Sequence, residues 1–271
     1  MLLPEWLHRT LRLPYFLKVS RHGRGPVVVF LHGIVAHRGI WAPAMAGLEN
    51  RYTCISIDLL GHGESPKPTH MMYTVDDHLR SIRWTLFWHG IWGKVTLVGH
   101  SMGAIISTHY AAVAPRKIRA LILCALPIYR TRDSIEEKRR FEALLDSGYL
   151  RFYRALRALP KGVVVRSAHR LVRMMPTIEE QAIINEHTWY PAVSSLANTI
   201  EQHTILEDVA RLQPELPVTV ISGRLDHLVI GANLKLAFAH RTDVQFVRIM
   251  SGHEVTKPFT REVIRAVREL S

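Results

Sequence analysis

A chain of 271 residues, 48% of them hydrophobic, is long enough to bury one large core with or without an inserted segment. Nowhere do about 18 apolar residues run together, so we expect a globular, cytoplasmic protein with neither a signal peptide nor a membrane span. The formal net charge is +12; without a nucleic-acid-binding motif we interpret it as a solvated basic surface, with no nucleic-acid partner and weak association with an anionic membrane surface as the alternative.

The first half of the chain alternates apolar runs with amphipathic stretches. The run from Pro26 to Leu31 is continuous, which is typical of a strand buried on both faces of a parallel sheet, and Ile118 to Cys124 is another expected buried strand. Alternation of strands and helices predicts that helices cover both faces of that sheet. The expected strands are 13–19, 26–31, 52–57, 95–98 and 118–124, and the expected helices are 41–48, 75–88 and 104–114.

Thr74 and the two cysteines allow finer predictions. Thr74 is expected to cap the helix that begins at Val75, since two aspartates follow in the first turn. Cys54 and Cys124 lie inside expected strands. We therefore interpret both cysteines as small core residues rather than as a disulfide or a metal-binding pair.

The alternation stops in the middle of the chain. Residues 128–203 contain helical periodicity and no convincing strand, and the stretch from Ile128 to Met175 holds twelve Lys or Arg against five Asp or Glu. This pattern predicts an all-helical cap, or lid, at 128–203, inserted into a core domain made of residues 1–127 and 204–271. Alternation resumes with expected strands at 217–223 and 244–250 and expected helices at 232–239 and 259–270.

The segment Gly99-His100-Ser101-Met102-Gly103 lies between an expected strand and an expected helix. A sharp turn there forces Ser101 toward a positive φ, and glycines two residues away on either side let the chain segments pass. The turn lifts the Ser101 hydroxyl above the edge of the sheet. This is the arrangement of a serine nucleophile.

Three candidate catalytic residues follow the carboxyl ends of expected strands, where ligands bind in open α/β sheets. They are Ser101, Asp226 and His253. A serine hydroxyl needs an imidazole to take its proton, and a carboxylate fixes the tautomer of that imidazole. We interpret His32 and His100 as structural histidines. The position after Cys124, where an alternative acid would stand, offers no carboxylate before Asp133.

Two backbone N–H groups are expected to form an oxyanion hole, those of Met102 and Ile34, the latter because it follows His32-Gly33. By their location in the chain, side chains of the cap and loops are candidates for the substrate pocket, each with core packing as the alternative. These candidates are His37, Tyr129, Tyr149, Phe152, Tyr153 and Trp189.

Five motifs together resemble those of the capped α/β-hydrolase superfamily. They are Leu31-His32-Gly33, Asp58-Leu59-Leu60-Gly61-His62-Gly63-Glu64-Ser65, Gly99-His100-Ser101-Met102-Gly103, Gly223-Arg224-Leu225-Asp226 and Gly252-His253. The resemblance implies an α/β fold with a mostly parallel central sheet flanked by helices and an all-helical cap inserted after the sixth strand. The similar branch holds carboxylesterases, lipase-like enzymes, lactonases, cofactor-free haloperoxidases and hydrolases of carbon–carbon bonds.

The expected function is hydrolysis of carboxylic esters with small to medium acyl chains through an acyl-enzyme, without metal or cofactor. The alternatives with the same triad are a carbon–carbon hydrolase of ring-cleavage products, a lactonase and a perhydrolase. The loop Ile34-Val35-Ala36-His37-Arg38 and His100 before the serine depart from the pattern of carbon–carbon hydrolases. A non-catalytic binding module is a remote alternative. We expect a monomer or a homodimer that acts on a small-molecule ester.

Overall fold

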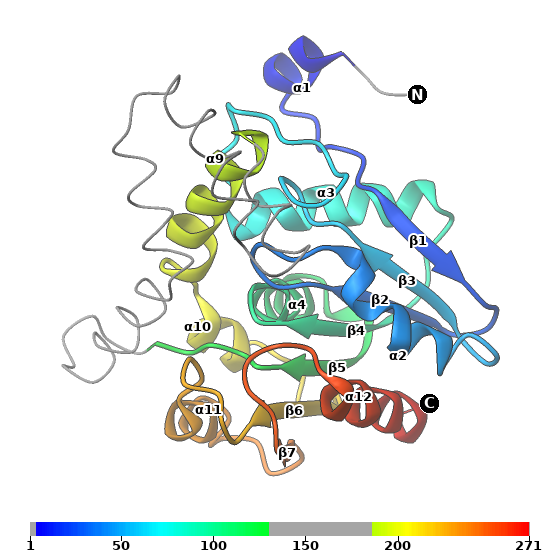
Figure 1. Ribbon diagram of the computed structural model, residues 1–271, viewed down its shortest axis with the longest axis vertical. Coiled ribbons are helices and arrows are strands. Elements are labelled where there is room, and N and C mark those ends of the chain that lie inside the picture. The colour runs from blue at the N-terminus through cyan, green and yellow to red at the C-terminus, as the bar shows by residue number, and fades with distance from the viewer. Residues whose placement is uncertain (1–3, 130–185, 271) are drawn as a thin grey trace, which may run out of the picture.

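The computed structural model describes residues 4–129 and 186–270. These form a seven-stranded sheet in the order β1-β3-β2-β4-β5-β6-β7 (Figure 1). All neighbouring strands are parallel except β1 and β3. The strands are β1 (Val19–His22), β2 (Val27–Leu31), β3 (Thr53–Ile57), β4 (Val95–His100), β5 (Ile118–Cys124), β6 (Val218–Gly223) and β7 (Gln245–Ile249). The α/β architecture expected from the sequence is confirmed.

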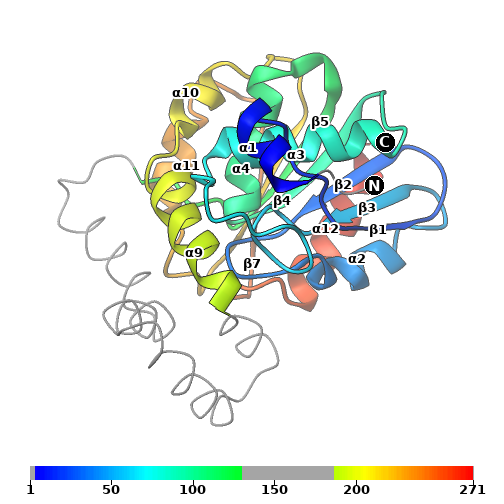
Figure 2. The ribbon, with the colours of Figure 1, turned by 90° about the horizontal axis from the view of Figure 1, so that it is seen from above.

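Helices cover both faces of this sheet. On one face α2 packs against α12, and on the other α4 packs against β4, α3 and α10 (Figure 2). The α-helices are α1 (Glu5–Leu11), α2 (Ala42–Ala46), α3 (Val75–Trp88), α4 (Met102–Val113), α9 (Glu186–Ser195), α10 (Ile205–Ala210), α11 (Gly231–Ala237) and α12 (Lys257–Glu269). Short 3₁₀ helices lie at Arg38–Trp41 and Pro115–Lys117, and a π-helical turn lies at Leu196–Ile200. Among the residues described, no helix is both long and apolar enough to cross a lipid bilayer.

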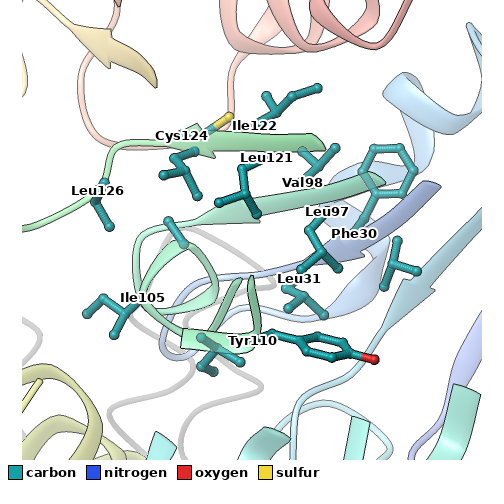
Figure 3. Close-up of a cluster of buried hydrophobic side chains, with 14 of the residues drawn as sticks. Phe30, Leu31, Leu97, Val98, Ile105, Tyr110, Leu121, Ile122, Cys124 and Leu126 are labelled. Carbon is teal, nitrogen blue, oxygen red and sulfur yellow. The ribbon is translucent and has the colours of Figure 1, made fainter. Parts of the chain in front are cut away.

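The core lies on both faces of the central strands, as continuous apolar runs predict. Phe30, Val98 and Ile122 are register neighbours on β2, β4 and β5 and point to one face. Leu97, with Leu31 and Leu121, points to the opposite face, toward α4 (Figure 3). The side chains of these strands are almost fully buried. The two cysteines are free thiols buried in this core, as expected.

The helix cap predicted at Thr74 is present. The Asp77 N–H donates to Thr74 Oγ1 at 3.2 Å, and the Thr74 N–H donates to Asp77 Oδ2 at 3.1 Å. This reciprocal pair satisfies two backbone donors at the start of α3. The helix spans the predicted residues 75–88.

The prediction of a strand at 13–19 was wrong. The first strand begins only at Val19 and continues to His22, where a turn was expected. Upstream, the backbone N–H groups of Tyr15 and Leu17 donate to the side-chain oxygens of Ser81 and Thr85 on α3. Those hydroxyls replace the strand partners that the apolar pattern predicted. The helix expected at 41–48 was also too long: α2 has five residues and follows a 3₁₀ turn.

The strand before residue 128 is β5, the fifth of the strands described, so the sixth-strand position expected for the cap does not hold. A single strand, β1, precedes β2 in this part of the chain, whereas a sixth-strand position requires two. Most of the expected cap, residues 130–185, lies outside the described residues. The described helical part contacts the core, because Tyr190 and Asn198 donate side-chain hydrogen bonds to the carbonyls of Met71 and Met72.

Candidate active site

Ser101 occupies the turn between β4 and α4, with φ 51° and ψ −115°. This is a conformation that a residue with a Cβ adopts only when its surroundings enforce it. A Cβ on Gly99 would clash with the backbone of Gly103, and a Cβ on Gly103 would clash with the backbone carbonyl of Leu31. The two glycines therefore permit the close packing that holds the turn.

The structure brings the three predicted catalytic residues together at the carboxyl ends of their strands. Ser101 follows β4, Asp226 follows β6 and His253 follows β7. His253 Nε2 lies 3.0 Å from Ser101 Oγ, and His253 Nδ1 lies 2.9 Å from Asp226 Oδ2. The three side chains form a continuous series of hydrogen bonds, although Ser101 lies more than 100 positions before the other two in the sequence.

The Asp226 side chain is fully buried, and both oxygens of its carboxylate accept hydrogen bonds from the protein. Its Oδ1 accepts hydrogen bonds from the backbone N–H groups of Leu228 at 2.8 Å and Val229 at 3.2 Å. Burial alone raises the pKa of this carboxyl, but the hydrogen bond and charge of His253 together with the two backbone donors outweigh burial and lower it. Asp226 is thus an anion suited to fixing His253 with its Nδ1 protonated.

The loop after β2 lies beside the serine. A Cβ on Gly33 would stand 3.2 Å from Ser101 Cβ, which places Ile34, the next residue, at the edge of the same site. Val35 has φ 61°, an unusual conformation for a β-branched residue. Met102 is the first residue of α4, where a backbone N–H has no acceptor within its own helix.

His32 holds this loop to the loop after β3. The Leu59 N–H donates to His32 Nε2 at 2.9 Å, so the ring proton resides on Nδ1 and is donated to the Gly33 carbonyl at 2.6 Å. Burial, followed by the neighbouring His62, lowers the pKa of His32 well below its ordinary value. The ring is completely buried. These contacts agree with the interpretation of His32 as a structural histidine.

Arg38 and Asp58 join the same two loops by charge. The fully buried Asp58 carboxylate accepts from the Arg38 N–H at 2.6 Å and from the Glu64 N–H at 2.8 Å, and it pairs with the Arg38 guanidinium. The guanidinium also pairs with Glu64. Asp58 and Glu64 belong to one of the sequence motifs, whereas no role was predicted for Arg38. No local pattern links Arg38 to a carboxylate 20 positions away.

The assignment of the pocket residues stays a prediction, and the structure places three of them. His37 accepts a hydrogen bond from the Gly39 N–H at 3.1 Å and caps a 3₁₀ helix. Tyr129 donates its hydroxyl to the Leu228 carbonyl at 3.1 Å, two residues from Asp226. Trp189 lies in α9, and its side chain is not described. Tyr149, Phe152 and Tyr153 lie outside the described residues. Within the ranges 4–129 and 186–270, no group of three or more His, Cys, Asp or Glu side chains is arranged to hold a metal ion.

Comparisons with known proteins agree with this fold. Residues 26–255 match the family model described as the alpha/beta hydrolase fold. The chain is 27% identical over 250 residues to 2-(acetamidomethylene)succinate hydrolase of Mesorhizobium japonicum, covering 79% of this chain and 85% of that protein. It is 31% identical over 141 residues to the probable lysophospholipase BODYGUARD 2 of Arabidopsis thaliana, but this match covers 49% of this chain and only 30% of the plant protein.

Solved structures lead to the same fold. That of E-2-(acetamidomethylene)succinate hydrolase has a TM-score of 0.69 at 23% identity and covers 94% of both chains. That of the enol-lactonase from Burkholderia xenovorans LB400 has a TM-score of 0.70 at 18% identity, covering 94% of this chain and 95% of the other. At such identities the likeness establishes the architecture alone. Because the family model matches residues 26–255, which are most of the chain, this protein belongs to the alpha/beta hydrolase fold family.

Proposed function

We propose that the protein is a serine hydrolase that cleaves carboxylic esters of small to medium acyl chain, with Ser101 as the nucleophile. The observation that carries the proposal is the hydrogen-bonded series from Ser101 Oγ through His253 to the buried Asp226 carboxylate, with contacts of 3.0 and 2.9 Å. Nucleophile, base and orienting acid are within the distances that this chemistry requires.

Proton transfer follows from the tautomer of His253. With its Nδ1–H donated to Asp226, the neutral ring has a free Nε2 lone pair that accepts the Ser101 proton. As that proton leaves, Ser101 Oγ attacks the ester carbonyl and forms a tetrahedral oxyanion. The backbone N–H groups of Ile34 and Met102 are the donors we assign to this oxyanion, each worth about 3–4 kcal/mol in comparable sites.

The intermediate collapses in two stages. His253 returns its proton to the leaving alcohol oxygen, the C–O bond breaks, and an acyl ester remains on Ser101. Water then gives a proton to His253 and attacks the acyl carbon, and the second tetrahedral intermediate releases the acid while His253 returns the proton to Ser101. Apart from water, each step uses only groups of the chain and its substrate.

A second candidate uses the same triad on a different substrate, either the cyclic ester of a lactone or the carbon–carbon bond next to a ketone in a ring-cleavage product. The relative matched over most of both chains is named for hydrolysis of 2-(acetamidomethylene)succinate, and a similar structure is that of an enol-lactonase. These names support a small unsaturated substrate, an enamide or an enol-lactone, as readily as a simple ester.

The test compares initial rates on p-nitrophenyl esters from acetate to palmitate, on an enol-lactone and on 2-(acetamidomethylene)succinate. Ser101→Ala is compared with Ser222→Ala, which removes a half-buried hydroxyl on β6 that no proposed step uses. Ester turnover lost only in Ser101→Ala supports the esterase. Turnover of the lactone or the succinate derivative without ester turnover favours the second candidate. Ester turnover that survives Ser101→Ala contradicts both.

A further inference from the structure

An aromatic cluster stands exposed at the C-terminal end of α3, away from Ser101. Phe87, Trp88 and Trp92 are 54%, 61% and 65% exposed. Their rings pack against one another. The centroid of the Phe87 ring lies 5.8 Å from that of Trp88 and 6.2 Å from that of Trp92, and the centroids of Trp84 and Trp88 are 5.6 Å apart. We call these four residues the aromatic patch. Beside it, Phe16, itself 40% exposed, stacks on His89.

Packing within the protein does not explain the aromatic patch. The buried face of α3 consists of smaller side chains, among them Leu79, Ile82 and Leu86. An exposed helix face is ordinarily polar, so aromatic rings there are costly unless a partner covers them. Trp92 Nε1 donates to the Phe87 carbonyl at 3.1 Å, which orients the outermost ring as part of a fixed surface.

Cations surround the aromatic patch. Arg21 donates to the His89 carbonyl at 3.0 Å, and Lys117 donates to the Trp92 carbonyl at 2.7 Å. Arg83, Lys94 and Arg116 are exposed on the same helix, the following loop and the turn before β5. The sequence contains no Asp or Glu from position 78 to position 132. From position 78 on, α3, the loop before β4 and the turn before β5 therefore carry no acidic side chain; on β1, His22 beside Arg21 pairs with Glu49.

We propose that the aromatic patch and its surrounding cations bind the surface of an anionic lipid bilayer. Tryptophan is favoured at the boundary between lipid and water, where its ring is apolar and its N–H polar. Lysine and arginine beside it reach anionic headgroups while their aliphatic stems lie on apolar surface. Pairing of two copies through this surface is opposed, because it would bring the same cations face to face.

The proposal fixes the orientation of the protein on the membrane. Trp92 lies three residues before β4, whereas Ser101 lies at the other end of that strand. A strand of this length separates them by about 20 Å. The bilayer would thus contact the amino-terminal edge of the sheet, and the candidate active site at the carboxyl edge would face away from it. Hydrolysis of a water-soluble ester should be unaffected by the docking.

Co-sedimentation with vesicles tests the proposal. Vesicles of phosphatidylcholine alone are compared with vesicles containing about one-third phosphatidylglycerol, at low and high salt. The variant Phe87→Ser/Trp88→Ser/Trp92→Ser removes the exposed rings, and Lys94→Gln/Arg116→Gln removes two cations while leaving the rings in place. The matched control is Trp6→Ser on α1, because Trp6 is 65% exposed like Trp92 but lies outside the aromatic patch.

We expect binding to the anionic vesicles that weakens with salt. The aromatic variant should bind at least tenfold more weakly, on the order of the loss of one apolar side chain, the cation variant about 30-fold more weakly, and Trp6→Ser like the wild type. Circular dichroism and hydrolysis of a soluble ester verify that each variant folds. If the aromatic variant does not fold, the binding of the cation variant tests the proposal. Equal binding to neutral vesicles, loss of binding in Trp6→Ser alone, or a wild-type dimer that the aromatic variant dissociates would overturn the proposal.

Discussion

The His100 ring donates a hydrogen bond from Nε2 to the backbone carbonyl of His253 at 2.7 Å. His100 immediately precedes Ser101, so this bond joins the turn that carries the serine to the loop that carries its base. Burial, followed by the nearby charge of His253, lowers the pKa of His100 to about 3. The ring therefore stays neutral, with the single proton on Nε2. The structural role expected for His100 is therefore to fix the position of His253.

We predict that His100→Ala lowers kcat by about 10- to 100-fold, because a small displacement of a catalytic base is costly even when its chemistry is unchanged. His100→Gln, whose amide N–H₂ can reach a carbonyl, should recover part of the loss. The measurement is kcat and KM on a soluble ester for both variants. Equal kcat in the wild type and the alanine variant would contradict the positioning role. A raised KM with unchanged kcat would indicate a role in substrate binding instead.

Asp226→Asn tests the role of the acid. An amide at this position no longer holds the Nδ1 proton of His253 by charge, and it permits the tautomer whose Nε2–H cannot accept from Ser101. In another serine hydrolase this change lowers kcat by about 10⁴-fold, and we expect a loss of similar size here. Asp243→Asn is the control, since Asp243 pairs with Arg241 away from the triad. Similar activity in both variants would sink the assignment of Asp226.

Arg38→Ala should destabilise the fold. It leaves the Asp58 carboxylate buried without its cation, and breaking a buried pair in this way costs about 3–5 kcal/mol of unfolding free energy. The double variant Arg38→Ala/Asp58→Asn should regain part of that loss, because the uncompensated charge is gone. Urea unfolding of the wild type, Arg38→Ala, Asp58→Asn and the double variant measures the coupling. Additive losses would mean that the two side chains do not depend on each other.

The elements and site residues that were predicted share a local signal. β2 is a continuous apolar run, β5 is one apart from Arg119, and Ser101, Asp226 and His253 each follow a strand end. What the sequence could not predict depends on contacts between distant segments. The strand expected from residue 13 fails because Ser81 and Thr85 supply hydroxyl acceptors to Tyr15 and Leu17. The pairing of Arg38 with Asp58 likewise exists only once two loops are folded together.

Three buried histidines predict how stability changes with pH. Burial is the main cause that lowers the pKa of His32 and His78 well below the ordinary value of about 6.5, and that of His62 to about 4. Below about pH 6.5 the unfolded chain binds protons that the folded chain excludes, so the unfolding free energy falls as pH falls from about 6.5 toward 4. The slope reaches up to about 1.4 kcal/mol per pH unit for each such histidine.

His109 acts in the opposite direction. Its hydrogen bond to Asp208 is the main cause that raises its pKa, so its contribution is present at low pH and is lost as pH rises through the raised value. Because the raised pKa of His109 lies above 6.5, its contribution is already complete below about pH 6.5. The slope between about pH 6.5 and 4 is therefore set by the buried histidines, which also include His100, and should be a loss of stability on acidification. Urea midpoints at several pH values measure it. His109→Gln should abolish the gain in stability that acidification brings from above the raised pKa of His109 down to about pH 6.5, and should leave the acid loss below about pH 6.5 unchanged. A midpoint that rises on acidification from about pH 6.5 to 4 would show that the buried histidines do not govern this range.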